Sequence, residues 1–241
     1  MIFHVLLALT LYQQTVAGLI EKRYGGVEYL LVSAESSEVI ASNWPDYERP
    51  QPVGSLVKPL LLAADDAGSK RFRCNAYRCW KPGGHGVLDA SEALAQSCNS
   101  WFEQLADSIP KDRVEDFVNR YGLAGPHGPS MIGLGTDWLL SPIQLLRAYG
   151  ALASNELIHR GLLAAADHGT ASELQAHGRV LAKTGTAACS HKQGQPGDGY
   201  VIVMLPAEKP EWLLLVRLHG TTGARAAAAA SGMVQIIETG R

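Results

Sequence analysis

Strand-forming segments lie at both ends of this 241-residue chain, and helix-forming segments fill the middle. Apolar runs typical of strands cover residues 27–32, 38–41, 179–187, 200–205 and 212–218. One sheet that contains them all must be assembled from both ends of the sequence, because two strands precede the helical stretch and three follow it. We therefore predict an α+β fold, in which a central antiparallel sheet is flanked by helices and packed against a helical subdomain.

The helical segments follow from apolar spacing and from helix start signals. We predict helices over residues 13–23, 56–64, 90–106, 111–121, 141–149 and 224–237, with a break near Ser97 in the third. Ser141 suits the cap of its helix, and Pro142 suits the first turn. Neither a repeat nor a linker divides the chain, so we expect a single domain over 13–241, with its sheet from 24–42 and 179–241 and a helical region at about 56–165.

Composition excludes one broad class of partner. The net charge is −2, the pI is about 6.4, and the basic residues are scattered rather than clustered. A nucleic-acid-binding surface needs a basic patch or stripe, so we expect no nucleic-acid partner. Hydrophobic residues make up 46% of the chain and charged residues 18%, which indicates a folded globular protein.

The N-terminal segment has two competing interpretations. Residues 2–12 form an apolar run that suits a signal peptide or anchor, and Thr15-Val-Ala17 offers a small-residue cleavage site, although a basic flank is missing. Alternatively, residues 13–23 form the first helix of the domain, which cleavage after Ala17 would destroy. We predict an exported protein, with residues 1–12 as the signal or anchor segment.

Two of the four cysteines, Cys74 and Cys79, lie close together in a loop-like stretch. In an oxidising compartment they could form a disulfide, and with His85 they could contribute to a zinc site. No fourth zinc ligand is evident in the sequence, so we predict no metal. Cys98 and Cys189 are expected to be small buried residues.

A serine and a lysine three residues apart, Ser55 and Lys58, open the predicted helix 56–64. Residues at this spacing share a helix face, so the Lys58 amine can reach the Ser55 hydroxyl. A serine needs a neighbouring base to act as a nucleophile, and a lysine that is buried beside another cation can have its pKa lowered enough to be that base. The helix N-terminus would favour negative charge on an attacked carbonyl oxygen. Alone, the same pair is typical of a helix cap followed by a solvated lysine.

Two further groups of polar residues complete the candidate site. Lys183, Thr184, Gly185 and Thr186 lie within a predicted strand, and a glycine there often marks the close approach of another backbone or a ligand. The flanking cation and hydroxyls suit an extended peptide that ends in a carboxylate. Ser97 and Asn99 lie at the helix break, where such residues are also common as caps.

Taken together, these groups resemble the penicillin-binding and serine β-lactamase-like superfamily, and within it the class B transpeptidase branch. The resemblance rests on Gly54-Ser-Leu-Val-Lys-Pro59, Cys79-Trp-Lys-Pro-Gly-Gly-His-Gly86, Ala93-Leu-Ala-Gln-Ser-Cys-Asn-Ser-Trp-Phe102, Ile132-Gly-Leu-Gly135 with Ser141-Pro-Ile-Gln-Leu-Leu-Arg-Ala-Tyr149, and Lys183-Thr-Gly-Thr-Ala187. It covers roughly residues 13 to 238.

The resemblance implies a mechanism of acyl transfer from D-Ala-D-Ala peptides of peptidoglycan, or from β-lactams, without a cofactor. It implies that Ser55 is the nucleophile, Lys58 its base and Ser97 the relay of a proton to the leaving amine. By the same resemblance, Asn99 holds the substrate amide, and the Lys183 to Thr186 strand binds the carboxylate. The backbone N–H groups of Ser55 and Thr186 form the oxyanion hole. A cell-wall synthesis protein is an expected partner.

Several activities fit this resemblance. The compact span from Ser97 to Lys183 leaves a transpeptidase, a carboxypeptidase and a partner-dependent enzyme open. A non-catalytic β-lactam sensor or scaffold is the non-enzymatic alternative, and a serine β-lactamase is a third. Glu156 lacks the partner residues of a class A deacylation loop. The second motif, Ser97-Cys-Asn99, has Asn at its third position, unlike the pattern of class D enzymes. We therefore expect a long-lived acyl-enzyme.

Overall fold

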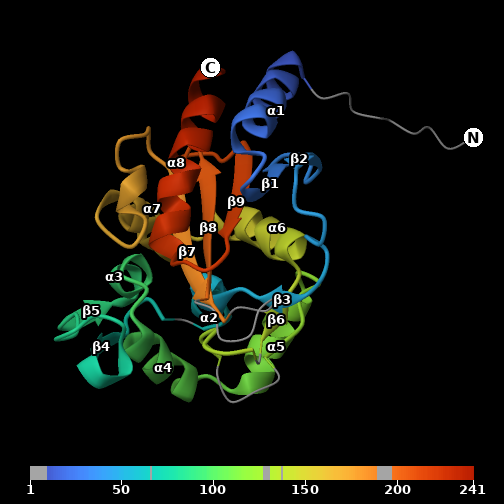
Figure 1. Cartoon of the computed structure of the whole chain (residues 1–241). Coiled ribbons are helices and arrows are strands. Elements are labelled where there is room, and N and C mark those ends of the chain that lie inside the picture. Colours follow the sequence, from blue (N-terminus) through green and yellow to red (C-terminus); the bar gives the residue numbers. More distant parts are fainter. Residues whose placement is uncertain (1–9, 66, 127–130, 137, 189–196) are drawn as a thin grey trace, which may run out of the picture.

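A five-stranded antiparallel sheet forms the centre of the computed structural model, which describes residues 10–65, 67–126, 131–136, 138–188 and 197–241 (Figure 1). The strands are β1 (Glu28–Ser33), β2 (Val39–Ser42), β7 (Leu181–Ala187), β8 (Asp198–Leu205) and β9 (Trp212–Leu218). Their order is β2-β1-β9-β8-β7, so the strand from the N-terminal part, β1, pairs directly with the last strand, β9. The predicted α+β fold with a sheet drawn from both ends of the chain is confirmed.

Each face of the sheet is covered by a different set of helices. Helices α1 (Leu11–Tyr24) and α8 (Gly223–Thr239) pack on one face, where they contact alternate strand residues such as Leu31 and Val203. The intervening residues, such as Leu30 and Ile202, face the helical part of the molecule. Because successive side chains of a strand point to opposite faces, a sheet buried on both sides needs the nearly continuous apolar runs seen in the sequence.

The helical region lies between β2 and β7 in the chain. It contains α2 (Lys58–Ala64), α3 (Ala90–Ala95), α4 (Asn99–Ser108), α5 (Lys111–Asn119), α6 (Pro142–Leu152) and α7 (Glu156–Asp167). Its smaller elements are β3 (Gln51–Pro52) paired with β6 (Leu139–Leu140), β4 (Arg71–Arg73) paired with β5 (Val87–Asp89), and the 3₁₀ turns η1 (Gly54–Val57), η2 (Ala76–Arg78) and η3 (Ser172–Leu174). Helix α7, these short strands and the 3₁₀ turns were not predicted.

The expected helix over 56–64 is wrong at its start. Residues Gly54–Val57 form the 3₁₀ turn η1, and the α-helix begins only at Lys58. Ser55 therefore lies in a tight turn before the helix rather than at the helix N-terminus. Ser141 does occupy the first cap position of α6, but its hydroxyl donates to the Tyr47 carbonyl instead of capping the helix.

The alternative interpretation of the N-terminal segment, in which residues 13–23 form the first helix of the domain, agrees with the presence of helix α1. Val16 and Ile20 are fully buried on the sheet face shared with α8. Cleavage after Ala17 would therefore remove half of a packed helix. Most of the apolar run at residues 2–12 lies outside the described residues. Among the described helices, none combines the length and the hydropathy needed to cross a bilayer.

Candidate active site

The Ser55 turn and strand β7 are held in close contact by two glycines. Gly54 has φ +60°, and a Cβ atom there would lie 2.4 Å from the backbone oxygen of Thr186. A Cβ at Gly185 would lie 2.7 Å from the Val53 carbonyl oxygen. Only glycine combines this positive φ with so close an approach of two backbones. The glycines next to Ser55 in the turn and next to Thr186 in the strand thus allow these two residues to lie close together.

Lys58 lies at the start of α2 and is completely buried. Its amine donates to the Ser97 carbonyl at 2.8 Å, to the Asn99 Oδ1 at 2.7 Å and to the Ser97 hydroxyl at 3.3 Å. The ammonium also lies 5.3 Å from the centre of the Phe102 ring. The predicted hydrogen bond to the Ser55 hydroxyl is replaced by these contacts, and among the described residues that hydroxyl has no partner. The 3₁₀ geometry nevertheless puts Ser55 and Lys58 on one side, because side chains three apart eclipse in such a turn.

Ser97 lies between two lysines at the break between α3 and α4. Its hydroxyl accepts a hydrogen bond from Lys183 at 2.8 Å in addition to the one from Lys58. Its backbone has φ 48°, which is uncommon for a residue with a side chain and costs energy that neighbouring structure must offset. The predicted break is confirmed, and it turns the Ser97 hydroxyl and carbonyl towards the buried amines.

Both lysines are shifted towards the neutral amine. Burial lowers the pKa of Lys58 to about 7, against weaker opposing effects of Cys98, Cys79 and Glu103. Burial, and then the charge of Lys58, lower the pKa of Lys183 well below its ordinary value. Two ammonium groups joined through one hydroxyl repel each other, so the pair favours at most one positive charge. A neutral lysine amine next to a serine turn is a proton acceptor.

The two threonines of the strand differ in their surroundings. Thr184 is buried, and its hydroxyl donates to Thr170 at 2.6 Å. Thr186 is exposed, and its hydroxyl accepts the backbone N–H of Gly223 at 3.0 Å. Thr186 is therefore the more solvent-exposed of the two threonines. Thr170 was missed because nothing in its sequence neighbourhood marks it as a partner of the strand.

Tyr149 supports the Ser55 turn, although its sequence gave no indication of this role. Its hydroxyl donates to the Leu56 carbonyl at 2.7 Å, and its side chain is buried. Gly133, with φ +77°, packs against the carbonyl of Gly54 from another side. Both belong to the stretches 132–135 and 141–149 that carried the resemblance.

The structure brings the eight predicted site residues into one region formed by η1, α2, the start of α4 and β7. The predicted residues are Ser55, Lys58, Ser97, Asn99, Lys183, Thr184, Gly185 and Thr186. Direct hydrogen bonds join Lys58, Ser97, Asn99 and Lys183. Ser55 and Thr186 are connected to them through the contact of Gly54 and Gly185 with the neighbouring backbone.

Beside this region, Cys74, Cys79, His85 and Cys98 form a compact cluster, with ligand atoms within 4.8 Å of one another. The three cysteines are free thiols. Burial raises the pKa of the Cys98 thiol well above its usual range. The sequence offered no fourth partner for the first three residues, and the structure supplies Cys98. Cys189 lies outside the described residues.

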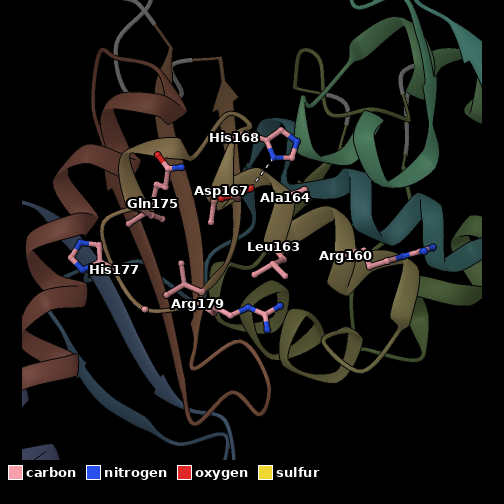
Figure 2. Close-up of a pocket in the computed structure, with 12 residues that line it drawn as sticks. Arg160, Leu163, Ala164, Asp167, His168, Gln175, His177 and Arg179 are labelled. Atoms are coloured by element: carbon pink, nitrogen blue, oxygen red, sulfur yellow. Dashed lines mark hydrogen bonds and ion pairs between the residues drawn. The ribbon is translucent and has the colours of Figure 1, made fainter.

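A separate cavity of about 440 Å³ lies between α7, η3 and the residues that lead into β7 (Figure 2). Figure 2 shows Arg160, His168, His177 and Arg179 around it, with His168 paired to Asp167. None of the eight predicted site residues lines this cavity. It is therefore distinct from the candidate active site.

Comparison with known proteins agrees with this arrangement. Residues 52–160 match the family described as penicillin binding protein transpeptidase domain, a stretch that includes Ser55, Lys58, Ser97 and Asn99. The peptidoglycan D,D-transpeptidase MrdA of Salmonella typhimurium is 28% identical over 109 residues, covering 33% of this chain and 18% of that protein. Stage V sporulation protein D of Bacillus subtilis is 33% identical over 115 residues, covering 42% of this chain and 17% of that protein. The matches thus span less than a fifth of these relatives.

Solved structures show the same fold over nearly the whole chain. Pseudomonas aeruginosa PBP2, solved in complex with WCK 5153, has a TM-score of 0.76 at 16% identity, covering 95% of this chain and 73% of that one. Helicobacter pylori PBP2, solved in complex with MreC, has a TM-score of 0.76 at 17% identity, covering 94% of this chain and 62% of that one.

The fold is therefore the β-lactamase-like fold of penicillin-binding proteins. The chain is thus similar over residues 52–160 to the penicillin binding protein transpeptidase domain family, and over nearly its whole length it has the fold of the PBP2 structures.

Proposed function

We propose that this chain is a serine D,D-acyltransferase that forms an acyl-enzyme at Ser55 with D-Ala-D-Ala peptides of peptidoglycan and with β-lactams. The observation that carries the proposal is the contact of three buried groups, the amines of Lys58 and Lys183 with the Ser97 hydroxyl between them, beside the Ser55 turn. A structural role alone gives little reason to bury two lysines without a carboxylate between them, because burying charge is costly.

In the first step, the Ser55 oxygen attacks the carbonyl carbon of the penultimate D-Ala while Lys58 takes the hydroxyl proton. A neutral lysine amine has two N–H groups, and the short bonds to the Ser97 carbonyl and Asn99 Oδ1 use both. Its lone pair is then left for a hydroxyl proton. The pKa of about 7 makes a large fraction of the amine neutral at physiological pH.

In the second half of that step, the C–N bond to the terminal D-Ala breaks and its amine receives a proton through Ser97. Once Lys58 carries the Ser55 proton, its third N–H can donate to the Ser97 hydroxyl, which also accepts from Lys183 and can pass its own proton on. An amine of a second stem peptide, or water, then attacks the ester and releases Ser55. With the amine as the acceptor the chain is a transpeptidase, and with water as the acceptor it is a carboxypeptidase.

The substrate would be held by groups that stand ready at the strand. We assign the substrate carboxylate to Lys183, Thr184 and Thr186, the amide to Asn99, and the oxyanion to the backbone N–H groups of Ser55 and Thr186. Gly185 lets the strand approach the Ser55 turn closely enough for this arrangement. The extracytoplasmic face of the membrane is the compartment that peptidoglycan chemistry requires. A cell-wall synthesis protein is the proposed partner, by analogy with the complex of Helicobacter pylori PBP2 and MreC.

A fluorescent penicillin tests the proposal on the purified full chain. We expect covalent labelling that is abolished in Ser55→Ala and retained in Ser69→Ala, an exposed serine of a surface turn. Labelling that survives Ser55→Ala, or the absence of labelling in the unmodified chain, contradicts it. Slow release of the label excludes the β-lactamase alternative, and release of D-Ala from a stem pentapeptide excludes the sensor.

A further inference from the structure

The segment that contains β4, η2 and β5 differs from the rest of the chain in its charge. The whole chain has a net charge of −2, but residues 70–88 contain five lysines and arginines and no aspartate or glutamate. These cations are Lys70, Arg71, Arg73, Arg78 and Lys81. Figure 1 shows β4 and β5 at the edge of the molecule, beside α3 and α4. A local excess of positive charge attracts anions, even though the basic residues of the whole chain are scattered.

Two aromatic rings are exposed on the same segment. Tyr77 is fully exposed, and Trp80 is 53% exposed. The Trp80 indole N–H donates to the Gln96 carbonyl at 3.1 Å, and its ring packs edge-on against His85. Because these contacts fix its orientation, Trp80 presents a partly open ring to a partner at little entropy cost. Tyrosine and tryptophan are enriched in the surfaces that proteins use for binding.

The cations of β4 lie on the outward face of the β4–β5 hairpin. Arg73 is opposite Val87 in the register, and Phe72 is opposite Leu88. Phe72 and Leu88 pack in the hydrophobic core, whereas Arg71, Arg73 and Val87 are exposed. Because successive side chains of a strand point to opposite faces, Arg71 and Arg73 share the solvent-facing side of the hairpin with Val87.

Three of the five cations have no ionic partner among the residues that the structure describes. Two are paired, Lys70 with Asp65 at 2.6 Å and Arg78 with Glu103 at 3.3 Å. The other three are exposed, and they are Arg71, Arg73 and Lys81. Asp89 lies opposite Arg71, but its carboxylate caps α3. The unpaired charges are therefore available to an anionic partner, and a guanidinium can hold a carboxylate by two parallel hydrogen bonds.

The segment is joined to both sides of the turn at residues 97–99 of the candidate active site. The Asn75 N–H donates to the Ser100 hydroxyl at 2.8 Å, just after this turn. The bond from Trp80 to the Gln96 carbonyl lies just before it. A polymer bound to the segment would therefore lie beside the residues that are proposed to handle its peptide.

We propose that this segment is a docking surface for a polymeric peptidoglycan strand, with Arg71, Arg73, Tyr77, Trp80 and Lys81 as its contact residues. The proposal rests on the proposed function, because it concerns the polymer that carries the D-Ala-D-Ala peptides. A peptidoglycan strand combines sugar rings, whose apolar faces stack on aromatic rings, with stem peptides that carry free carboxylates for the cations. The surface contains none of the eight predicted site residues, so it recruits the polymer and takes no part in the bond-making steps.

An anionic bilayer is the other large surface that basic and aromatic residues can bind. Membrane-surface segments, however, present a continuous apolar face that enters the headgroup region. The outward face of the hairpin carries Arg71 and Arg73 beside Val87, so these exposed residues form no such apolar face. The connection of the segment to the turn at 97–99 further favours the polymer whose peptides are to be bound there.

Sedimentation with purified insoluble peptidoglycan tests the surface on the full Ser55→Ala chain, in which binding is independent of acylation. Arg73→Glu/Lys81→Glu reverses two unpaired cations and is expected to weaken binding by about tenfold. The matched control is Lys111→Glu/Lys209→Glu, which reverses two exposed cations elsewhere and changes the net charge equally. We expect the control to bind as tightly as the parent chain. Equal binding by the two double variants, or no binding by the parent chain, overturns the proposal.

A second measurement alters the ligand and not the protein, so it does not depend on the folding of a surface variant. Peptidoglycan whose carboxylates have been chemically amidated is expected to bind about tenfold more weakly than untreated material. Equal binding of the two preparations contradicts the pairing of the cations with stem carboxylates. Sedimentation of the chain with vesicles of anionic phospholipid, but not with peptidoglycan, overturns the proposal in favour of a membrane. If peptidoglycan binds through this surface but the unmodified chain forms no penicillin adduct, the docking surface stands and the proposed acyl transfer falls.

Discussion

Lys183 donates a hydrogen bond of 2.8 Å to the hydroxyl of Ser97, although 86 residues separate the two in the chain. Lys58, at the start of α2, donates to the same hydroxyl, so this one oxygen connects the helical region to strand β7 of the sheet. In a dry interior such a shared contact strengthens the hydrogen bonds and fixes the positions of the three groups. Ser97 is therefore the residue on which the two halves of the proposed site depend.

Removal of the Ser97 hydroxyl distinguishes its proposed role in proton transfer from a role in substrate binding. Ser97→Ala is expected to reduce the rate of acylation by a penicillin by about 10²-fold, the contribution typical of a positioned proton-transfer group. Ser108→Ala removes an exposed hydroxyl and is expected to leave the rate unchanged. Stopped-flow measurement of acylation checks both. Equal rates in Ser97→Ala and the unmodified chain would remove Ser97 from the mechanism.

The lowered pKa of Lys58 predicts a pH dependence with a defined sign. Only the neutral amine can accept the Ser55 proton, so acylation is expected to rise as pH increases through about 7 and to level off above it. The rate constant for acylation, measured from pH 5.5 to 9 in steps, checks the profile. A lysine with its ordinary pKa would instead give a rate that continues to rise beyond pH 9.

The close packing of the Ser55 turn predicts a strong effect of one methyl group. Gly54→Ala would place a Cβ 2.4 Å from the Thr186 backbone oxygen in a left-handed conformation. We expect a loss of stability of about 1–3 kcal/mol and impaired acylation, because the turn must move away from β7. Denaturant unfolding and penicillin labelling measure the two effects.

The matched control for that substitution is Gly18→Ala on the exposed face of α1. A Cβ there meets nothing within 4 Å, so the change is expected to stabilise the helix by about 0.5–1 kcal/mol and to leave labelling intact. If Gly54→Ala behaved as Gly18→Ala does, the interlocking of the turn with the strand would be refuted.

Tyr149 predicts a stability effect that is separate from chemistry. Tyr149→Phe leaves the buried Leu56 carbonyl without the 2.7 Å hydrogen bond, which is expected to cost about 1–3 kcal/mol. Tyr77→Phe is the control, since Tyr77 is fully exposed and its change is expected to be neutral. Thermal and denaturant unfolding of the two variants, side by side, provide the comparison.

Periodicity and turn chemistry were enough to predict the sheet and most helices. The alternating faces of β1 and β9 need apolar residues on both sides, which is visible in the sequence as continuous apolar runs. The start of α2 could not be predicted, because the 3₁₀ turn at Ser55 depends on the backbone of β7 and not on local propensity. Residues that contact the sheet only through tertiary structure, such as Thr170, leave no local signal.

The site was predicted from motifs, and its hydrogen bonds were not. The spacing of Ser55 and Lys58 indicated a direct contact, whereas the structure directs the Lys58 amine to Ser97 and Asn99. The fourth member of the cysteine cluster was hidden for a similar reason: Cys98 is 13 residues beyond His85, and only the packing of α4 against the loop brings it close.

Peptide mapping of the penicillin adduct tests the central claim most directly. Intact-mass analysis of the unmodified chain after reaction is expected to show one added acyl group, and digestion is expected to place it on the peptide that contains Ser55. An acyl group on any other residue, or an unmodified mass after prolonged reaction, would contradict the account.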